Sequence, residues 1–455
     1  MPAVDRADAA DLPLRVVYRT WWPLAASWLL MGFELPAVSA VMARLPHPTV
    51  SLAAYGGVVF PLSLMIEAPI IMLLSASTAL SKDWSSYRLV RRFALTLGLS
   101  LTALHALVAF TPLYYVVVRD VLGVPAEILE PARRGLQIMT PWTISIAYRR
   151  FQQGVLIRYG RSGAVGIGTA IRLAGNAVVL AIGYTIGTVP GIVVGTLAVA
   201  VGVVSEAVFA GFVVHPVIAR HVRPAPPAEP LTFPAFLRFY APLALTPLIA
   251  FAAMPMASAA MSRMPRAVES LAVWPVINGL VFTMRSVGFA MNEVVVSLLD
   301  RPRAVPALRR FSLVLAAVMT GTLLVTAATP LGALWFGRVS ALPPALVALG
   351  GIGLWISWLQ PGLSVFQSWY QGAIVHSRHT RGVTESVLVY LVTTGALLFA
   401  GIAFGRITGL HVALAALVAG GAAQVVWLWL RARGTIRALE AGEGAAVAAT
   451  VPPLG

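Results

Sequence analysis

The chain has 455 residues, of which 58% are hydrophobic and only 11% are charged, and its mean hydropathy is +0.84. Soluble chains are typically about a quarter charged, so this composition excludes an ordinary water-soluble globule and indicates a bilayer as the solvent. The formal net charge of +16 suits a nucleic-acid partner, but basic loops on one side of a membrane explain it better, and we expect no nucleic-acid partner. The absence of cysteine excludes disulfides, thiolate metal sites and cysteine nucleophiles.

Apolar runs recur along the whole chain, and each is long enough to cross about 30 Å of hydrocarbon. The connections between them are short, and the longest, at residues 221–230, is rich in proline. No segment remains for a soluble domain. The pattern predicts about twelve transmembrane helices, at residues 20–42, 52–80, 93–118, 135–157, 163–186, 189–217, 236–261, 270–298, 311–335, 343–375, 383–405 and 409–430.

The distribution of the 33 basic residues orients this layout. Twenty-three, among them Arg149 and Arg150, are assigned to the two chain ends and to alternate loops, eight to the loops between these, and two, Arg172 and Arg285, to spans. Because basic residues gather in cytoplasmic loops, the bias predicts that both termini are cytoplasmic. We therefore expect a multi-pass protein of the cell membrane with an even number of helices.

The two halves of the chain repeat one another. A shift of 219 residues places Met42-Ala-Arg-Leu-Pro46 on Met261-Ser-Arg-Met-Pro265, and a shift of 218 places Arg91-Arg-Phe93 on Arg309-Arg-Phe311. The alternative that residues 1–43 are a signal peptide, cleaved after Ala40, is disfavoured because the same pattern recurs in mid-chain. Each half holds about six helices, so both halves cross the membrane in the same sense.

This repeat predicts an all-α membrane protein whose two parallel six-helix repeats form two lobes. The predicted domains are an N-terminal lobe (1–217), a proline-rich cytoplasmic linker (218–235), a C-terminal lobe (236–432) and a flexible cytoplasmic tail (433–455).

Two large transporter architectures have parallel repeats of this size. The major facilitator type usually carries a glycine-rich loop after its second helix, and the loop at residues 80–92 lacks those glycines. The chain instead resembles the multidrug and toxic compound extrusion (MATE) family and its relatives in the multidrug/oligosaccharidyl-lipid/polysaccharide (MOP) exporter superfamily. The resembling motifs are Trp22-Pro-Leu24, Leu52-Ala-Ala54, Phe151-Gln-Gln-Gly154 and Arg172-Leu-Ala-Gly-Asn176, whereas Leu52-Ala-Ala-Tyr-Gly56 and Gly154-Val-Leu-Ile-Arg-Tyr159 are similar to progressive-ankylosis (ANK) proteins.

Carboxylates within spans are the predicted ion-coupling residues, because an ionisable group there costs at least about 2.5–3.5 kcal/mol. The resemblance implies a coupling carboxylate in the first helix, where this chain has Glu34; the alternative is a carboxylate that snorkels to the headgroups. Glu67 and Arg285 are equivalent under the 218-residue shift and carry opposite charges, and Glu293 lies two turns beyond Arg285. The candidates are thus Glu34, Glu67 and Glu293, with a proton or sodium ion as the coupling ion and no other cofactor.

Polar stripes along several spans are the predicted walls of a substrate cavity or gate. Asn278, Arg285 and Asn292 recur every seven residues on one helix face. The alternative is hydrogen bonding between helices, but stripes that include arginine or glutamate are expected to line water. Glu206 and Glu385 stay unassigned, and no histidine has metal-ligand spacing with a carboxylate, so no metal is expected. The candidates are Arg149, Gln153, Arg172, Asn176, Asn278, Arg285, Asn292, Gln360, Ser364, Gln367 and Gln371.

Together these features favour a monomeric secondary-active exporter that moves a small organic solute by alternating access among membrane lipids. Two alternatives keep the fold: an ANK-like exporter of organic or phosphate anions such as pyrophosphate, citrate or nucleotides, and a flippase for lipid-linked precursors. An intramembrane enzyme is disfavoured because no His-Glu-x-x-His motif or close pair of intramembrane aspartates is present. We also expect Glu67 and Arg285 to form a gate between lobes, unless Arg285 pairs locally with Glu293.

Overall fold

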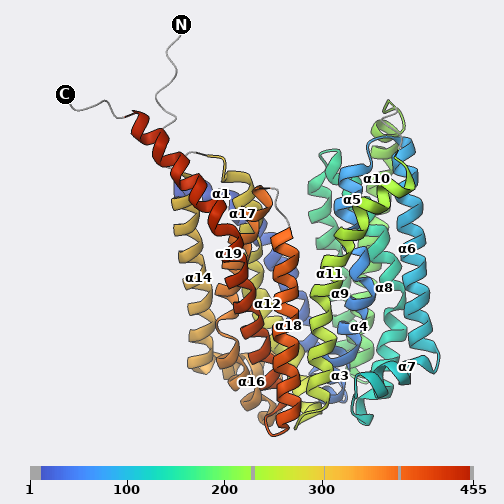
Figure 1. Cartoon of the computed structure of the whole chain (residues 1–455). Coiled ribbons are helices and arrows are strands. Elements are labelled where there is room, and N and C mark those ends of the chain that lie inside the picture. Colours follow the sequence, from blue (N-terminus) through green and yellow to red (C-terminus); the bar gives the residue numbers. More distant parts are fainter. Residues whose placement is uncertain (1–11, 227–230, 302, 378–380, 451–455) are drawn as a thin grey trace.

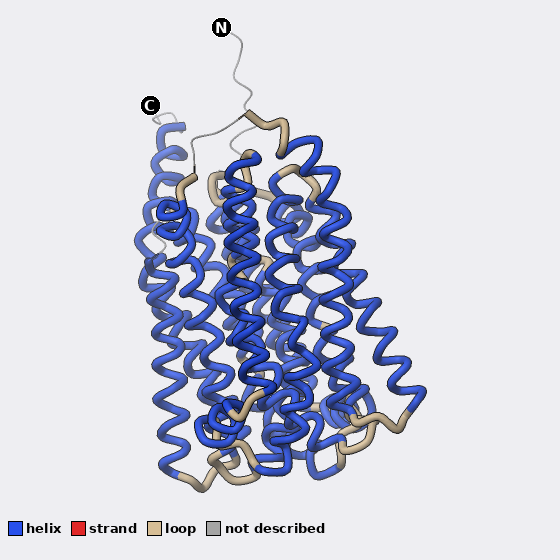
Figure 2. The backbone as a smooth tube through the Cα atoms, turned by 90° about the vertical axis from the view of Figure 1, so that its right-hand side faces the viewer, coloured by secondary structure: helices blue, strands red, loops and turns tan. Residues whose placement is uncertain are grey.

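The computed structural model describes residues 12–226, 231–301, 303–377 and 381–450, and every regular element in these ranges is a helix (Figure 1). A view turned by 90° shows the helices running roughly parallel, with the loops gathered at the two ends of the molecule (Figure 2). Eleven helical stretches of the described chain are long and apolar enough to cross a membrane. The predicted all-α class is confirmed.

Each half consists of long helices interrupted by short π-helical or 3-10 turns (η). The first half contains α1 (Leu14–Gly32), α2 (Glu34–Met42), α3 (Pro48–Ala54), η2 (Tyr55–Val59), α4 (Phe60–Glu67), η3 (Ala68–Ile70), α5 (Leu73–Leu80), α6 (Trp84–Phe110), α7 (Leu113–Tyr115), η4 (Val116–Val121), α8 (Ala126–Arg158), α9 (Ser162–Ile186), α10 (Gly191–Val217) and η5 (Ile218–Val222). The second half contains α11 (Phe233–Ser262), α12 (Ala267–Phe289), α13 (Met291–Leu298), α14 (Ala304–Ala328), α15 (Pro330–Leu334), η6 (Trp335–Val339), α16 (Pro344–Ser357), α17 (Gln360–His376), α18 (Arg381–Phe404) and α19 (Gly409–Thr450).

The remaining predicted span, the fourth in chain order at residues 135–157, lies within α8. This helix is 33 residues long, and its length therefore suffices to cross a membrane. It is absent from the apolar stretches because it carries several charged side chains along its length. It packs against α6 and α10 within the first lobe (Figure 1); its Arg149 is buried, whereas Glu127, Glu130 and Arg134 near its start are exposed.

The backbone repeats as the sequence does. Six of the eight described residues with positive φ fall at equivalent positions of the two halves: His47 and Arg266, Gly123 and Ala341, Gly187 and Gly405. The amide of Gly191 donates to the carbonyl of Pro46, and the equivalent amide of Gly409 donates to the carbonyl of Pro265. Positive φ is uncommon for residues other than glycine, so its recurrence at equivalent positions shows that the backbone conformation is repeated as well as the sequence.

Two predicted span ends are wrong. The third span was expected to reach residue 118 and the ninth to reach 335, but α6 ends at Phe110 and α14 at Ala328. Each helix is followed by a Thr-Pro pair, and a residue before proline avoids the helical region. Thr111 and Thr329 are both extended as this rule requires, and each chain then turns into a short helix at the membrane boundary.

The first helices of the two halves cross between the lobes. Trp21 and its neighbours on α1 are buried against α12, α13 and α14 of the second half, and the Trp21 indole donates to the carbonyl of Val287 (3.1 Å). In exchange, the first turns of α11 pack on the first half, where Phe236 lies against Phe93 and the Tyr240 hydroxyl donates to the carbonyl of Pro69. Across the lobes, α1 thus contacts α12, α13 and α14, and α11 contacts α4 and η3. The predicted bounds of the lobes assign α1 to the first lobe and α11 to the second, without these contacts across the lobes. Those bounds stay a prediction.

The last helix extends beyond the predicted final span. α19 continues from Gly409 to Thr450, so residues 433–450 of the predicted tail are helical. The segment is rich in alanine, which favours helix. The predicted linker is likewise partly helical, since η5 continues α10 to Val222 and α11 begins at Phe233; its residues 227–230 lie outside the described residues.

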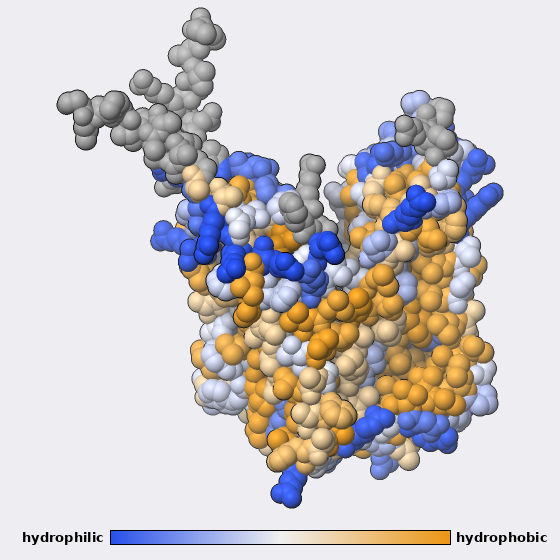
Figure 3. Space-filling view, in the orientation of Figure 1, coloured by the Kyte–Doolittle hydropathy of each residue, from blue (hydrophilic) through white to orange (hydrophobic). Residues whose placement is uncertain are grey.

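The lobes are apart at one end and together at the other. The space-filling view shows a hollow between them that opens on the side where α1 begins and α19 ends (Figure 3), hereafter the termini side. Hydrophobic residues cover the middle of the visible face, and hydrophilic residues gather toward the two ends of the molecule (Figure 3).

Two arginines join the lobes at the opposite end. Arg44, just after α2, donates to the carbonyls of Arg338 (2.6 Å) and Val339 (2.8 Å) at the end of η6. Its repeat equivalent Arg263, just after α11, donates to the carbonyls of Val121 (2.6 Å) and Leu122 (2.7 Å) at the end of η4. Each half thus fastens an arginine onto the main chain of the other, and we call the two contacts the arginine latches.

Loss of both latches is expected to open this end of the molecule. In an Arg44→Gln, Arg263→Gln variant the bidentate charge-assisted donors are gone, so the distance between the lobes there should lengthen. Because the native chain has no cysteine, spin labels at Glu127→Cys and Ala345→Cys, equivalent exposed positions of the two halves, report this distance by pulsed electron paramagnetic resonance.

The matched control is Arg119→Gln, Arg406→Gln. Both are exposed arginines assigned to the same side, Arg119 pairs with Asp120 of its own half, and Arg406 makes no contact with the other half among the described residues. The control should keep the wild-type distance distribution. A latch variant with that same distribution would show that the latches do not hold the lobes.

Candidate functional site

The first span is broken at Phe33, and this break positions Glu34. Pro36 has no N–H to donate to the carbonyl of Gly32, and its ring crowds that carbonyl, so α1 ends at Gly32 and α2 begins at Glu34. The freed Gly32 carbonyl accepts a hydrogen bond from Thr283 Oγ1 of α12 (2.9 Å). Glu34 is therefore the first residue of a helix, where the helix dipole favours a negative charge.

Two side chains of α9 bind the Glu34 carboxylate. Arg172 Nη2 donates to Oε2 and Asn176 Nδ2 donates to Oε1, both at 2.6 Å. The Glu34 side chain is 16% exposed, so the contact is enclosed but not sealed. The structure thus brings together three residues that were predicted separately. Instead of snorkelling freely, Glu34 ties the start of α2 to α9.

A second carboxylate, Glu206 of α10, lies deeper in the same lobe. Its side chain has no exposed surface. Arg149 Nη1 donates to both carboxylate oxygens at 2.9 Å, and Gln153 Nε2 donates to one of them, also at 2.9 Å. These donors stand one turn apart on α8, so the ion pair holds α8 against α10.

Arg172 connects the two carboxylates. Its Nε lies 3.9 Å from Glu206 Oε2, while its Nη2 binds Glu34. The resulting chain, Glu34–Arg172–Glu206–Arg149, passes through α2, α9, α10 and α8. Removing one member of a buried ion pair leaves an uncompensated charge, which is much costlier than the intact pair. The four helices of the first lobe are therefore electrostatically linked.

Glu67 belongs to the same cluster but has no hydrogen-bond partner among the described residues. It is the last residue of α4, next to the Pro69 turn, and is 3% exposed. The cations whose charge acts on it are Arg150, Arg149 and Arg172. Arg150 also keeps its Nε buried and unpartnered. A carboxylate and a guanidinium with unused hydrogen-bonding capacity thus lie in one charged cluster.

Sequence reasoning missed Glu206 and Arg150. Assigning Arg149 and Arg150 to a loop was wrong, because α8 continues two turns further, to Arg158, and Arg149 is 4% exposed. The available signal was Glu206 itself, a lone carboxylate in the apolar run 192–214, which requires a buried cation.

In the second lobe the structure brings together Arg285, Gln360 and Ser364. Arg285 Nη1 lies 3.5 Å from Gln360 Oε1, its guanidinium stands over the ring of Phe289, and Ser364 Oγ donates to its carbonyl (3.2 Å). The Arg285 and Glu67 side chains form no ion pair with each other, and Arg285 forms none with Glu293. Glu293 is exposed on α13. Both predicted pairings of Arg285 stay predictions for another arrangement of the lobes.

The other predicted polar residues of the second lobe are not joined into this group. Their side chains are half-buried and make no hydrogen bond with the described residues. The Nδ2 atom of Asn278 is fully enclosed without an acceptor. These residues are Asn278, Asn292, Gln367 and Gln371.

No protein-family model matches the chain, and no curated protein matches its sequence. Solved structures do match. An inward-facing multidrug resistance MATE family transporter of the MOP superfamily aligns with a TM-score of 0.71 at 14% identity, over 93% of this chain and 98% of that chain. The lipid II flippase MurJ in an inward closed conformation aligns with a TM-score of 0.69 at 15% identity, over 92% and 90%.

An outward-facing MATE family transporter of the same superfamily aligns with a lower TM-score, 0.60, at 16% identity and over 95% and 98% of the two chains. The inward-facing MATE structure thus aligns with a higher TM-score than the outward-facing one. At these identities the likeness concerns the fold, and it extends over almost the whole chain. The chain is an integral multi-pass membrane protein with the fold of the MATE transporters of the MOP superfamily.

Proposed function

We propose that this protein is a secondary-active exporter that moves a small organic solute by alternating access and is coupled to a proton or sodium gradient. The observation that carries the proposal is the position of Glu34. Its carboxylate is bound by the first lobe through Arg172, while two residues earlier the Gly32 carbonyl is bound by Thr283 of the second half. The coupling candidate therefore stands at the joint between the two bodies that must move.

Neutralising Glu34 would change the forces on this joint. An ionised Glu34 accepts charge-assisted hydrogen bonds from Arg172 and Asn176, which hold the start of α2 on α9. A protonated Glu34 loses the ion pair, whereas the Thr283 bond to Gly32 does not depend on charge. The angle between α1 and α2 is then less constrained by the first lobe. Proton binding would in this way bias the two lobe arrangements by its differential affinity for them.

Glu67 is the second coupling candidate for a different reason. It is buried without a hydrogen bond, and a neutral acid costs far less to bury than an unpaired carboxylate. When all are ionised, Glu34, Glu67 and Glu206 balance Arg149, Arg150 and Arg172. A proton or sodium ion arriving at Glu67 leaves an excess positive charge in the lobe. That excess is the physical link between the coupling ion and the rest of the cluster.

The remaining features of the proposal follow from the charge bias of the loops. The protein would lie in the cell membrane with the termini side facing the cytoplasm, because the basic residues gather there. One chain contains both lobes, so a monomer supplies the complete transport unit.

An anionic substrate is the second candidate. The observation that favours it is Arg150, a cation of the buried cluster whose Nε atom has no acceptor. Such a donor suits a carboxylate or phosphate. Thermal-shift screening of the purified protein against organic cations, polyanions and lipid-linked precursors distinguishes this reading from cation export and from the flippase.

Coupling is expected to require Glu34 or Glu67, with Glu293 as the third candidate. Glutamine keeps the size of each side chain but removes its charge, so Glu34→Gln and Glu67→Gln should lose gradient-driven transport. The measurement is uptake of the best ligand from the screen into proteoliposomes under an imposed proton or sodium gradient.

The control is Glu385→Gln, which removes an ion pair with Arg431 at the start of α18, away from the first-lobe cluster. It should keep wild-type gradient dependence. If Glu34→Gln, Glu67→Gln and Glu293→Gln all keep it as well, coupling by these carboxylates is wrong.

The predicted gate between lobes is tested by charge reversal. Glu67→Arg alone should be inactive because it adds a fourth cation beside Arg149, Arg150 and Arg172, and Arg285→Glu alone should be inactive because it removes the gate's cation. The exchange of both charges should recover part of the transport, measured in the same proteoliposomes with the folded fraction checked by size-exclusion chromatography. If the double variant with both charges exchanged transports nothing, while Glu293→Arg restores transport to Arg285→Glu, the local pair of Arg285 and Glu293 is established instead.

A further inference from the structure

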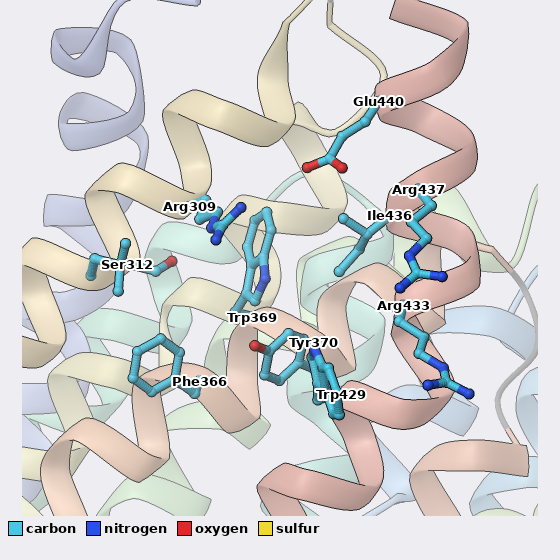
Figure 4. A pocket seen from close by; sticks show the side chains of 11 residues that line it. Arg309, Ser312, Phe366, Trp369, Tyr370, Trp429, Arg433, Ile436, Arg437 and Glu440 are labelled. Atoms are coloured by element: carbon cyan, nitrogen blue, oxygen red, sulfur yellow. The ribbon is translucent and has the colours of Figure 1, made fainter.

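A cavity of about 300 Å³ lies between α14, α17 and α19, far from the charged cluster of the first lobe (Figure 4). It is located toward the termini side, because α14 begins and α17 ends there (Figure 1). Its walls combine three arginines with several aromatic side chains. The arginines are Arg309, Arg433 and Arg437, and the aromatic residues are Phe366, Trp369, Tyr370 and Trp429.

The three arginines have no anionic partner. None of them makes a hydrogen bond or an ion pair with the described residues, and Arg433 only lies over the ring of Trp429, at 6.0 Å from its centre. Glu440 stands at the rim of the cavity (Figure 4) but is not within ion-pair distance of any arginine. All three arginine side chains are exposed, and guanidinium groups with free donors suit a group with several acceptor oxygens, such as a phosphate.

The first lobe provides an internal comparison. Arg309 has an equivalent there, Arg91, and Ile436 has Ile218, whereas Trp429, Arg433 and Arg437 correspond to Gly211, His215 and Ala219. The space is also closed, because Tyr148, the equivalent of Phe366, packs so tightly on Gly211 that an added Cβ would lie 2.7 Å from its hydroxyl. The set of side chains that line the cavity is thus specific to the second lobe.

The surroundings of the cavity are apolar and face outward. Leu313, which lines it, is 50% exposed, its neighbour Val314 is 56% exposed, and Trp429 is 45% exposed. In a membrane these side chains contact lipid, and tryptophan and arginine together mark the depth of the headgroups. A ligand here meets acyl chains on one side and guanidinium groups on the other.

We propose that this cavity binds the phosphate group of an anionic phospholipid from the leaflet on the termini side. Arg309, Arg433 and Arg437 bind the phosphate oxygens, Trp369 and Trp429 pack against the glycerol region, and the acyl chains lie along α14. Such a lipid would fix the extension of α19 to α14 and α17.

The experiment measures lipid binding to the full-length purified protein. Detergent-solubilised protein is incubated with phosphatidylglycerol, with phosphatidylcholine, or with phosphatidylglycerol plus millimolar inorganic phosphate, and retained lipid is counted by native mass spectrometry. The test variant is Arg309→Gln, Arg433→Gln, Arg437→Gln. Its matched control, Arg92→Gln, Arg220→Gln, Arg310→Gln, removes the same charge from exposed arginines that do not line the cavity.

Wild type and control should retain phosphatidylglycerol at least about tenfold better than the test variant, and better than phosphatidylcholine. Trp429→Ala keeps every arginine and should also reduce retention, which covers the case in which the triple variant does not fold. Equal losses in test and control variants, or equal retention of the two lipids, would overturn the site. Displacement by inorganic phosphate would overturn the lipid and leave a free phosphate as the ligand.

Discussion

The arrangement of the two lobes depends on how the main chain is satisfied where spans are interrupted. In hydrocarbon no water is available for a freed carbonyl, so each break needs a partner. In the described structure, the side-chain hydrogen bonds that join the halves all end on main-chain carbonyls: from Trp21 to Val287, Thr283 to Gly32, Tyr240 to Pro69, Arg44 to 338 and 339, and Arg263 to 121 and 122. No ion pair between described residues joins the halves. Carbonyl acceptors do not titrate, so protonation of the cluster does not act on these hydrogen bonds directly.

The repeat conserves shape but not charge. Five of the six charged residues of the first-lobe cluster have uncharged equivalents in the second half: Glu34 corresponds to Ala253, Arg149 to Gln367, Arg150 to Ser368, Arg172 to Tyr390 and Glu206 to Gln424. The exception is Glu67, whose equivalent is the cation Arg285. Gln424 is buried and bonds Ser386, a neutral contact between the same two helices of the repeat, α18 and α19. The first lobe therefore contains a balanced set of buried ions, whereas the second lobe has at the equivalent positions neutral side chains and a single charge, that of Arg285. Buried ion pairs contribute little net stability compared with well-packed neutral groups, which makes a role in transport the better explanation for retaining them.

Much of the fold was predictable because the sequence contains apolar runs of membrane-spanning length and an internal repeat. The twelve spans, the even crossing and the two-lobe class required only the length of each run and the register of Arg91-Arg-Phe93 against Arg309-Arg-Phe311. The exchange of α1 and α11 was not predictable, because an apolar helix in lipid carries no mark of which lobe will cover it. The site was predicted as separate residues. Glu34 and Arg172 are 138 positions apart, and whether they meet depends on the rotation of two helices about their axes, which a stripe of polar residues does not specify.

The crossing of α1 has a consequence for biosynthesis. Trp21 finds its acceptor, Val287, only 266 residues later, so at about 5–20 residues per second the first helix waits for some tens of seconds before its partner exists. A soluble protein would expose an adhesive surface during that time. Here lipid solvates the waiting face of Val17, Trp21 and Ala25 nearly as well as protein does. The bilayer therefore covers this face of α1 until the second half has been synthesised, and only then is the packing of the first lobe complete.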